Sequence, residues 1–249
     1  MALFTAYFDA SGKPDRGGVL SIAGYVSDYR KWARFRIEWA RILAGESVSS
    51  FHMTDFVSSR GEFAGWRGQT DRRRTFIEDL LVCAKRYTNK AFGGAVVLSD
   101  FDSVNRRYQL EEHAGQPYPL CAHYCVRLVR AWQAKNSIKN VEFVFEQGDE
   151  PRGKLIELCR ADGIEPRFLS KKEVAFQAAD LVAWRTRNSF EKVLSPGLTR
   201  DTALGAYRSF KEVWKSPHAA FYGNLSRIEK FCQDREIPLR TSAVTIAGG

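Results

Sequence analysis

With 249 residues and 44% hydrophobic content, the chain is long enough to bury a full core, and we expect a single elaborated domain. Lys and Arg total 38 against 29 Asp and Glu, a formal charge of +9 that favours a polyanionic partner such as nucleic acid. No charged segment followed by an apolar one opens the chain, and no stretch approaches roughly 18 uninterrupted apolar residues, which argues against a secretory leader or a membrane span. We therefore expect a soluble, cytoplasmic protein without a membrane partner.

The first predicted element is a strand that ends in a carboxylate. Residues 4–8 form a short apolar and aromatic run, and Asp9 follows it, before the turn residues Ser11 and Gly12. A second strand-like run covers residues 18–26 and is reached through a connection rich in Gly, Pro and Asp, which predicts an antiparallel hairpin. Asp9 should therefore lie near the open end of a sheet.

Two amphipathic helices are predicted next, separated by a Gly- and aromatic-rich loop over residues 58–68. Aromatic residues recur at helical spacing over 29–43, and Thr70 is a good N-cap for the second helix. Three arginines occupy the first turn of that second helix, against its dipole: Arg72, Arg73 and Arg74. They are interpreted either as partners of a phosphate or neighbouring carboxylate, or as a solvated basic face.

The middle of the chain alternates strands and helices. Strands are predicted over 91–98, 141–146 and 164–169, and helices over 99–108, 117–135 and 151–161, with Glu111, Glu112 and His113 in a loop. The strand at 141–146 also ends in an acid, Glu146. Ser170 and Glu173 have the spacing of a capping box for the following helix, in which Asp180 lies within an apolar run. A charge there is costly unless it is paired or bound to a metal.

The residues after 195 are predicted to form a helical extension packed on the core, so that residues 1–195 form the core and 196–249 the extension. Its apolar residues fall into two amphipathic stretches, one with Phe210, Val213 and Trp214 and one with Tyr222, Leu225, Ile228 and Phe231. The five cysteines form no Cys-x-x-Cys pair and are expected to be reduced thiols in the core. The four histidines are too scattered to complete a zinc site with them.

Three acids are distinguished by their context: Asp9 and Glu146 at strand ends, and Asp180 on a late helix. Carboxylates from two strand ends and a crossing helix suit Mg²⁺ or Mn²⁺, which prefer oxygen ligands, and two such ions would catalyse phosphodiester hydrolysis. Each acid also has a structural interpretation: Asp9 as a turn initiator, Glu146 as a partner of Arg152 or Lys154, and Asp180 as a buried partner of an arginine.

The order of these elements resembles the RNase H-like superfamily, and within it the bacterial group called domain of unknown function 3800. The motifs that carry the resemblance are YFDASG at 7–12, FHMTDF at 51–56, FEQGD at 145–149 and FQAADLVAW at 176–184. The resemblance covers most of the chain to about residue 195, and it implies a mixed sheet of about five strands flanked by helices. It implies that Asp9, Glu146 and Asp180 bind the metal, with Asp149 as a further ligand, and that Gln177 contacts substrate or a carboxylate. The group usually opens with Asp-Glu-Ser-Gly, whereas Ala10 replaces the glutamate here.

These residues predict a nuclease that depends on Mg²⁺ or Mn²⁺ and cleaves DNA or RNA. Its catalytic residues would be Asp9, Glu146 and Asp180, with His52 protonating a leaving group or touching a phosphate; in the structural interpretation His52 is a hydrogen-bonded histidine and Asp55 caps a turn. The basic residues assigned to substrate binding are Arg72, Arg73, Arg74, Lys171 and Lys172, together with Gln177. Two alternatives remain: an inactive nucleic-acid-binding or regulatory protein of a mobile-element or phage-defence system, and a protein-interaction module whose acids are structural.

Overall fold

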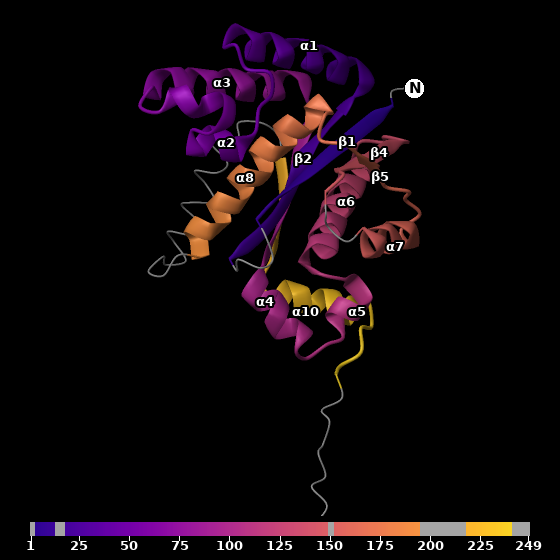
Figure 1. The fold of residues 1–249 in the computed structure, drawn as a ribbon. Helices are drawn as coiled ribbons and strands as arrows, with labels where there is room; N and C mark the ends of the chain where they lie inside the picture. Colours follow the sequence, from indigo (N-terminus) through magenta and orange to yellow (C-terminus); the bar gives the residue numbers. More distant parts are fainter. Residues whose placement is uncertain (1–2, 13–17, 149–151, 195–217, 241–249) are drawn as a thin grey trace, which may run out of the picture.

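A computed structural model describes residues 3–12, 18–148, 152–194 and 218–240 of the chain. Its centre is a mixed six-stranded sheet with the order β5-β4-β1-β2-β3-β6 (Figure 1). The strands are β1 (Phe4–Ser11), β2 (Val19–Asp28), β3 (Lys90–Val97), β4 (Val141–Glu146), β5 (Arg167–Leu169) and β6 (His218–Gly223). The predicted α/β fold, a mixed sheet flanked by helices, is confirmed, and the strand order is compatible with the RNase H-like arrangement.

The sheet contains both antiparallel and parallel strand pairs. β1 and β2 form the predicted antiparallel hairpin, and β2 continues antiparallel to β3. The pairs β1–β4, β4–β5 and β3–β6 are parallel, as expected for strands joined through long helical crossovers. β6 is the sixth strand, where about five were predicted. It comes from a region expected to be helical, and Tyr222 lies in this strand rather than in a helix.

Helices cover both faces of the sheet. The longer ones are α1 (Tyr29–Gly45), α3 (Thr70–Tyr87), α6 (Pro117–Lys135) and α8 (Val174–Leu194). The shorter ones are α2 (Met53–Ser58), the 3-10 helix η2 (Gly61–Trp66), α4 (Leu98–Asn105), α5 (Leu110–Ala114), α7 (Gly153–Ala161) and α10 (Leu225–Asp234). In Figure 1, α1, α2, α3 and α8 lie on one side of the central strands, and α6 and α7 on the other. No helix in the described ranges is long and apolar enough to cross a bilayer.

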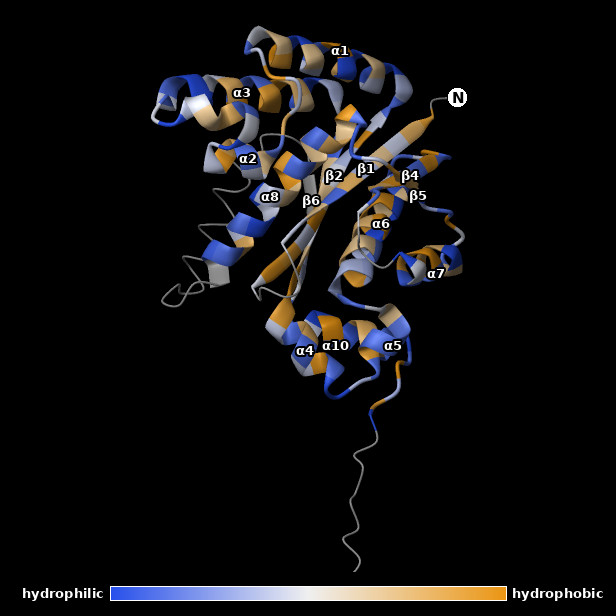
Figure 2. Cartoon of the chain, in the orientation of Figure 1, coloured by the Kyte–Doolittle hydropathy of each residue, from blue (hydrophilic) through white to orange (hydrophobic). Residues whose placement is uncertain are grey.

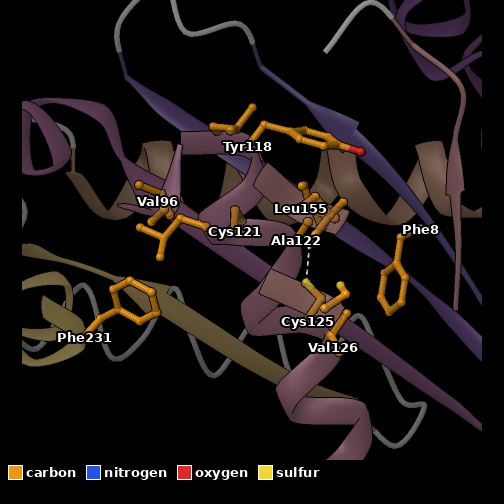
Figure 3. Close-up of a cluster of buried hydrophobic side chains, with 14 of the residues drawn as sticks. Phe8, Val96, Tyr118, Cys121, Ala122, Cys125, Val126, Leu155 and Phe231 are labelled. Carbon is orange, nitrogen blue, oxygen red and sulfur yellow. Dashed lines mark hydrogen bonds between the residues drawn. The ribbon is translucent and has the colours of Figure 1, made fainter. Parts of the chain in front are cut away.

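Two cores lie on the two faces of the sheet because strand residues alternate in direction. On β1, Ala6 and Phe8 join the core under α6, and Tyr7 joins the core under α8. Figure 3 shows the first core, where Phe8 and Leu155 lie around the α6 residues Cys121 and Cys125. All five cysteines are buried and free, which confirms the prediction of reduced core thiols.

The aromatic stripe of α1 covers the sheet as predicted. Trp32, Phe35 and Trp39 are buried, and the Trp32 indole Nε1 donates to the carbonyl of Thr5 at 2.9 Å. Asp28 caps the helix by accepting from the backbone N–H of Lys31 at 3.0 Å. In Figure 2, orange bands on α1 and α3 alternate with blue ones, as expected for helices with one face on the core and one in water.

Several local predictions are wrong. Thr70 is the first residue of α3 and not its cap, and the cap position is held by Gln69, whose side chain makes no capping hydrogen bond. The loop at 58–68 contains η2, and the segment with Glu111, Glu112 and His113 is the short helix α5. Ser170 forms no capping box, because the Glu173 side chain is drawn to Arg36, 2.9 Å away, and to the Ala175 N–H. The stretch with Phe210, Val213 and Trp214 lies outside the described residues.

Candidate functional site

The sheet places Asp9 and Glu146 side by side. Phe8 and Phe145 are partners in the parallel β1–β4 register, so the next residue on each strand is an acid. Phe8 and Phe145 both face the α6 core, and alternation therefore turns Asp9 and Glu146 to the opposite face, where α8 crosses β1. Asp9 and Glu146, predicted to lie at strand ends, therefore end two neighbouring strands on the same face of the sheet.

Asp9 is a buried carboxyl in an acidic environment. Asp9 is 8% exposed, and its Oδ1 accepts a hydrogen bond from the backbone N–H of Ala10 at 2.7 Å. Burial raises the pKa of Asp9 well above its usual range, and a hydrogen bond with Glu146 and the charge of Asp180 raise it further. Three carboxyl groups from β1, β4 and α8 therefore interact at one place.

Asp180 is held by backbone and by a histidine, not by an arginine in the described part of the chain. It is 6% exposed, and its Oδ2 accepts from the backbone N–H of Met53 at 2.7 Å. His52 Nδ1 lies 3.2 Å from the same oxygen, at ion-pair distance but away from good hydrogen-bond alignment. A buried carboxylate with these partners carries a charge that is only partly balanced.

Gln177, one turn before Asp180, fixes the same segment. Its Oε1 accepts from the backbone N–H of Phe51 and from the indole of Trp39, both at 2.9 Å. Gln177 and Asp180 thus bond the amides on either side of His52 and set the position of its ring. The predicted contact of Gln177 with a carboxylate is absent from the described structure; its oxygen is used to position backbone.

Lys171 closes a chain of polar contacts around the acids. Its Nζ lies 2.9 Å from His52 Nε2 and 3.7 Å from Glu146 Oε1. A charged lysine can only donate, so Nε2 of a neutral His52 must be the bare nitrogen and Nδ1 carries the proton that faces Asp180. Asp180 raises the pKa of His52, and burial and the charge of Lys171 oppose this shift. The polar contacts therefore form one chain, which runs from Asp180 through His52 and Lys171 to Glu146.

The donor chemistry of this cluster fits a hard cation. Asp9, Glu146 and Asp180 offer carboxylate oxygens, and a cation would relieve the repulsion among them, which adds to the effect of burial in raising the pKa of Asp9. Within the described ranges, no three His, Cys, Asp or Glu side chains are already gathered into a coordination shell. Asp9 and Glu146 are in direct contact, and the charge of Asp180 acts on Asp9. Asp149 lies outside the described residues.

The arginines of α3 bind the protein itself. Arg72 Nε lies 2.7 Å from Glu46 Oε2, and its guanidinium lies 4.0 Å from the ring centroid of Trp66. Arg73 donates to the hydroxyl of Ser59 and to the carbonyl of Phe56 on α2. Arg74 pairs with Asp71 at 2.8 Å. The opposition to the helix dipole is thus offset by local carboxylates and carbonyls.

The other candidate residues divide between the cluster and its rim. Lys171 lies in the cluster, whereas Lys172 is exposed beside it. Asp55 lies in the first turn of α2, close enough for its charge to raise the pKa of His52 slightly. The role of Trp39 was missed from sequence, where it counted only as a core aromatic. The available signal was indirect: the spacing of Gln177 and Asp180 puts both polar side chains on one helix face, so a neighbouring element must supply hydrogen-bond donors such as the Trp39 indole.

Sequence and structure comparisons return nothing for this chain: no family model, no curated protein and no solved structure matches it. The class of protein therefore rests on the fold and the cluster, an α/β protein with buried carboxylates at adjacent strand ends.

Proposed function

We propose that the protein is a metal-dependent nuclease, with Asp9, Glu146 and Asp180 holding Mg²⁺ or Mn²⁺. The observation that carries the proposal is the convergence of these acids: burial raises the pKa of Asp9, Glu146 and Asp180 raise it further, and a cation would relieve the repulsion among the three carboxylates. A divalent ion held there supplies Lewis-acid activation of phosphate and water. Nucleic acid is the partner favoured by the formal charge of +9.

The remaining polar residues have distinct tasks in this proposal. His52 is half-exposed and oriented from both sides by the bonds of Gln177 and Asp180, so in its protonated form it can deliver the proton on Nε2 to a leaving oxygen. Lys171 can leave Glu146 to contact a phosphate oxygen, since its side chain is half-exposed and flexible. Gln177 and Trp39 position these groups without touching substrate.

The experiment is a cleavage assay with the full chain on single- and double-stranded DNA, RNA and a hybrid duplex, with Mg²⁺ or Mn²⁺ and with excess chelator. We expect cleavage only with the metal. Asp180→Asn keeps the volume and an acceptor for Met53, and should reduce cleavage by more than about 100-fold, the upper range for loss of a supporting residue at a metal site.

Asp79→Asn is the matched control, because it removes the same charge from an exposed position on α3. It should retain wild-type cleavage. No cleavage of any substrate with either metal, or equal activity in Asp180→Asn and wild type, would refute the proposal and leave a protein that binds nucleic acid or another partner without hydrolysis.

A further inference from the structure

A second site lies on the other face of the sheet, between α6, β6 and α10. It is a cavity of about 370 Å³, within the size range of small-molecule pockets. Its lining residues are Tyr124, Arg127, Leu128, Phe221, Arg227, Lys230, Phe231 and Asp234. β6 is three strands from β1 in the sheet order, and α6 covers the face opposite to α8, so this cavity is separate from the carboxylate cluster.

One wall of the cavity is aromatic. The rings of Tyr124 and Phe221 are stacked with centroids 3.5 Å apart, and Phe231 lies 5.7 Å from Tyr124. Phe231 is anchored in the α6 core, where Figure 3 shows it near Val96 and Cys121. Tyr124 and Phe221 are only partly buried. Partly exposed aromatic surface in a cavity is suited to contact with a flat, apolar ring.

The rim of the cavity carries more positive than negative side chains. Lys230 is paired with Asp234 at 2.9 Å, which leaves two exposed guanidinium groups, Arg127 and Arg227. Neither has a carboxylate partner among the described residues. The Arg227 guanidinium lies 5.5 Å from the ring centroid of Phe221, so cation and aromatic wall adjoin. Guanidinium groups bind phosphate with two parallel hydrogen bonds.

We propose that this cavity binds one nucleotide unit, with its base against Tyr124 and Phe221 and its phosphate held by Arg127 and Arg227. Such a unit is provided either by a free nucleotide or by a single-stranded nucleic acid. Binding requires no metal and none of the carboxylates, so it is independent of the proposed nuclease activity.

The test is calorimetric titration of the full chain in excess chelator with AMP, adenosine, inorganic phosphate and a short oligothymidylate. AMP should bind more tightly than adenosine or phosphate, because it engages both wall and rim. The double variant Arg127→Ala/Arg227→Ala should weaken AMP about tenfold or more, the loss expected for charge-assisted hydrogen bonds. Phe221→Leu should weaken it about tenfold through the lost stacking.

Arg130→Ala is the matched control, since Arg130 is exposed on α6 and does not line the cavity. It should bind within about twofold of wild type. Asp180→Asn should also bind AMP normally, which separates this site from the carboxylates. Melting temperatures of all variants establish that they are folded.

If the oligothymidylate binds and AMP does not, and the double arginine variant loses this binding, the site is supported and single-stranded nucleic acid is its ligand. Three outcomes overturn the proposal: neither AMP nor the oligothymidylate binds, the double variant binds them as tightly as wild type, or inorganic phosphate binds as tightly as AMP. The last would mean that the rim holds an anion and the aromatic wall contributes nothing.

Discussion

The two faces of the sheet each carry a histidine paired with an aspartate, and the pairs behave in opposite ways. On the α8 face, His52 approaches Asp180 at 3.2 Å with 37% of its side chain exposed. On the α6 face, His123 Nε2 lies 2.7 Å from Asp162 Oδ2, and the histidine is fully buried. The pKa of His52 is raised, mainly by Asp180, whereas burial lowers the pKa of His123 despite its closer aspartate.

The difference lies in solvent and in neighbouring charge. Asp162 also faces Arg235 at 3.4 Å, so its charge is shared, and the three residues join α6, α7 and α10. His52 is instead placed between two groups of opposite charge, Asp180 and Lys171, with access to water. The same residue pair is therefore structural where burial dominates and able to exchange a proton where it does not.

The largest expected effect is on the cleavage rate, which should depend on the His52–Asp180 pair and not on the His123–Asp162 pair. His52→Ala should lower metal-dependent cleavage by about 100-fold or more, which is the contribution of a positioned general acid. His123→Gln should leave cleavage within about twofold of wild type, since it lies under the other face. Rates are compared well below the melting temperature of each variant. Equal losses in the two variants would remove the functional distinction between the pairs.

The next largest effect is on stability, where we expect the His123 variant to lose more than the His52 variant. His123→Ala should lower the free energy of unfolding by about 2–4 kcal/mol, because it empties a fully buried position and removes a hydrogen bond to Asp162. His52→Ala should cost about 1 kcal/mol, since Asp180 keeps the N–H of Met53. Urea unfolding in chelator measures both. A larger loss for His52 than for His123 contradicts the prediction.

Asp9→Asn tests the charge repulsion on the α8 face. A folded pKa above the unfolded one means that stability falls as pH rises through the folded pKa, because folding then requires a buried negative charge. In chelator near pH 8 the variant should therefore melt higher than wild type by roughly 2–4 °C, the shift that corresponds to about 1 kcal/mol in a chain of this size.

Near pH 4 this advantage of Asp9→Asn should disappear, and the stabilisation of wild type by added Mn²⁺ should be reduced in the variant. An Asp9→Asn protein that melts below wild type near pH 8, with both insensitive to metal, would show that the acids are structural.

The smallest effect is the opposite pH dependence of the two histidines. His123 has a lowered pKa, so its contribution to stability is present above about pH 6.5 and declines as pH falls. His52 has a raised pKa, so its contribution is present below about pH 6.5 and declines as pH rises through the folded pKa. As pH rises from about 5 to 8 in chelator, the loss of stability in His123→Gln relative to wild type should grow, and the loss in His52→Gln should shrink. Parallel changes would refute the contrast.

The sequence alone determined the elements that depend on local pattern. The hairpin of β1 and β2, the strand β4 that ends in Glu146 and the helix that buries Asp180 follow from apolar periodicity and turn residues. The sequence also predicted that both strands end in an acid, but the approach of Asp9 to Glu146 requires β1 and β4 to be neighbours, which the tertiary structure decides. Helix starts were predicted less well: α3 begins at Thr70 with Gln69 at its cap position, and the Glu173 side chain pairs with Arg36, which a local cap rule does not consider.

Only the tertiary structure decided which polar groups meet. Lys171 and His52 are 119 residues apart, and Gln177 and Trp39 are 138 apart, so no local pattern specifies their contacts. The same holds for β6, which is a strand because the edge of β3 offers it hydrogen bonds, and for the His123–Asp162–Arg235 group, which requires α6, α7 and α10 to pack together. Local periodicity reports whether a side chain is buried, but the charge, solvent and partners that set its chemistry come from segments distant in the chain.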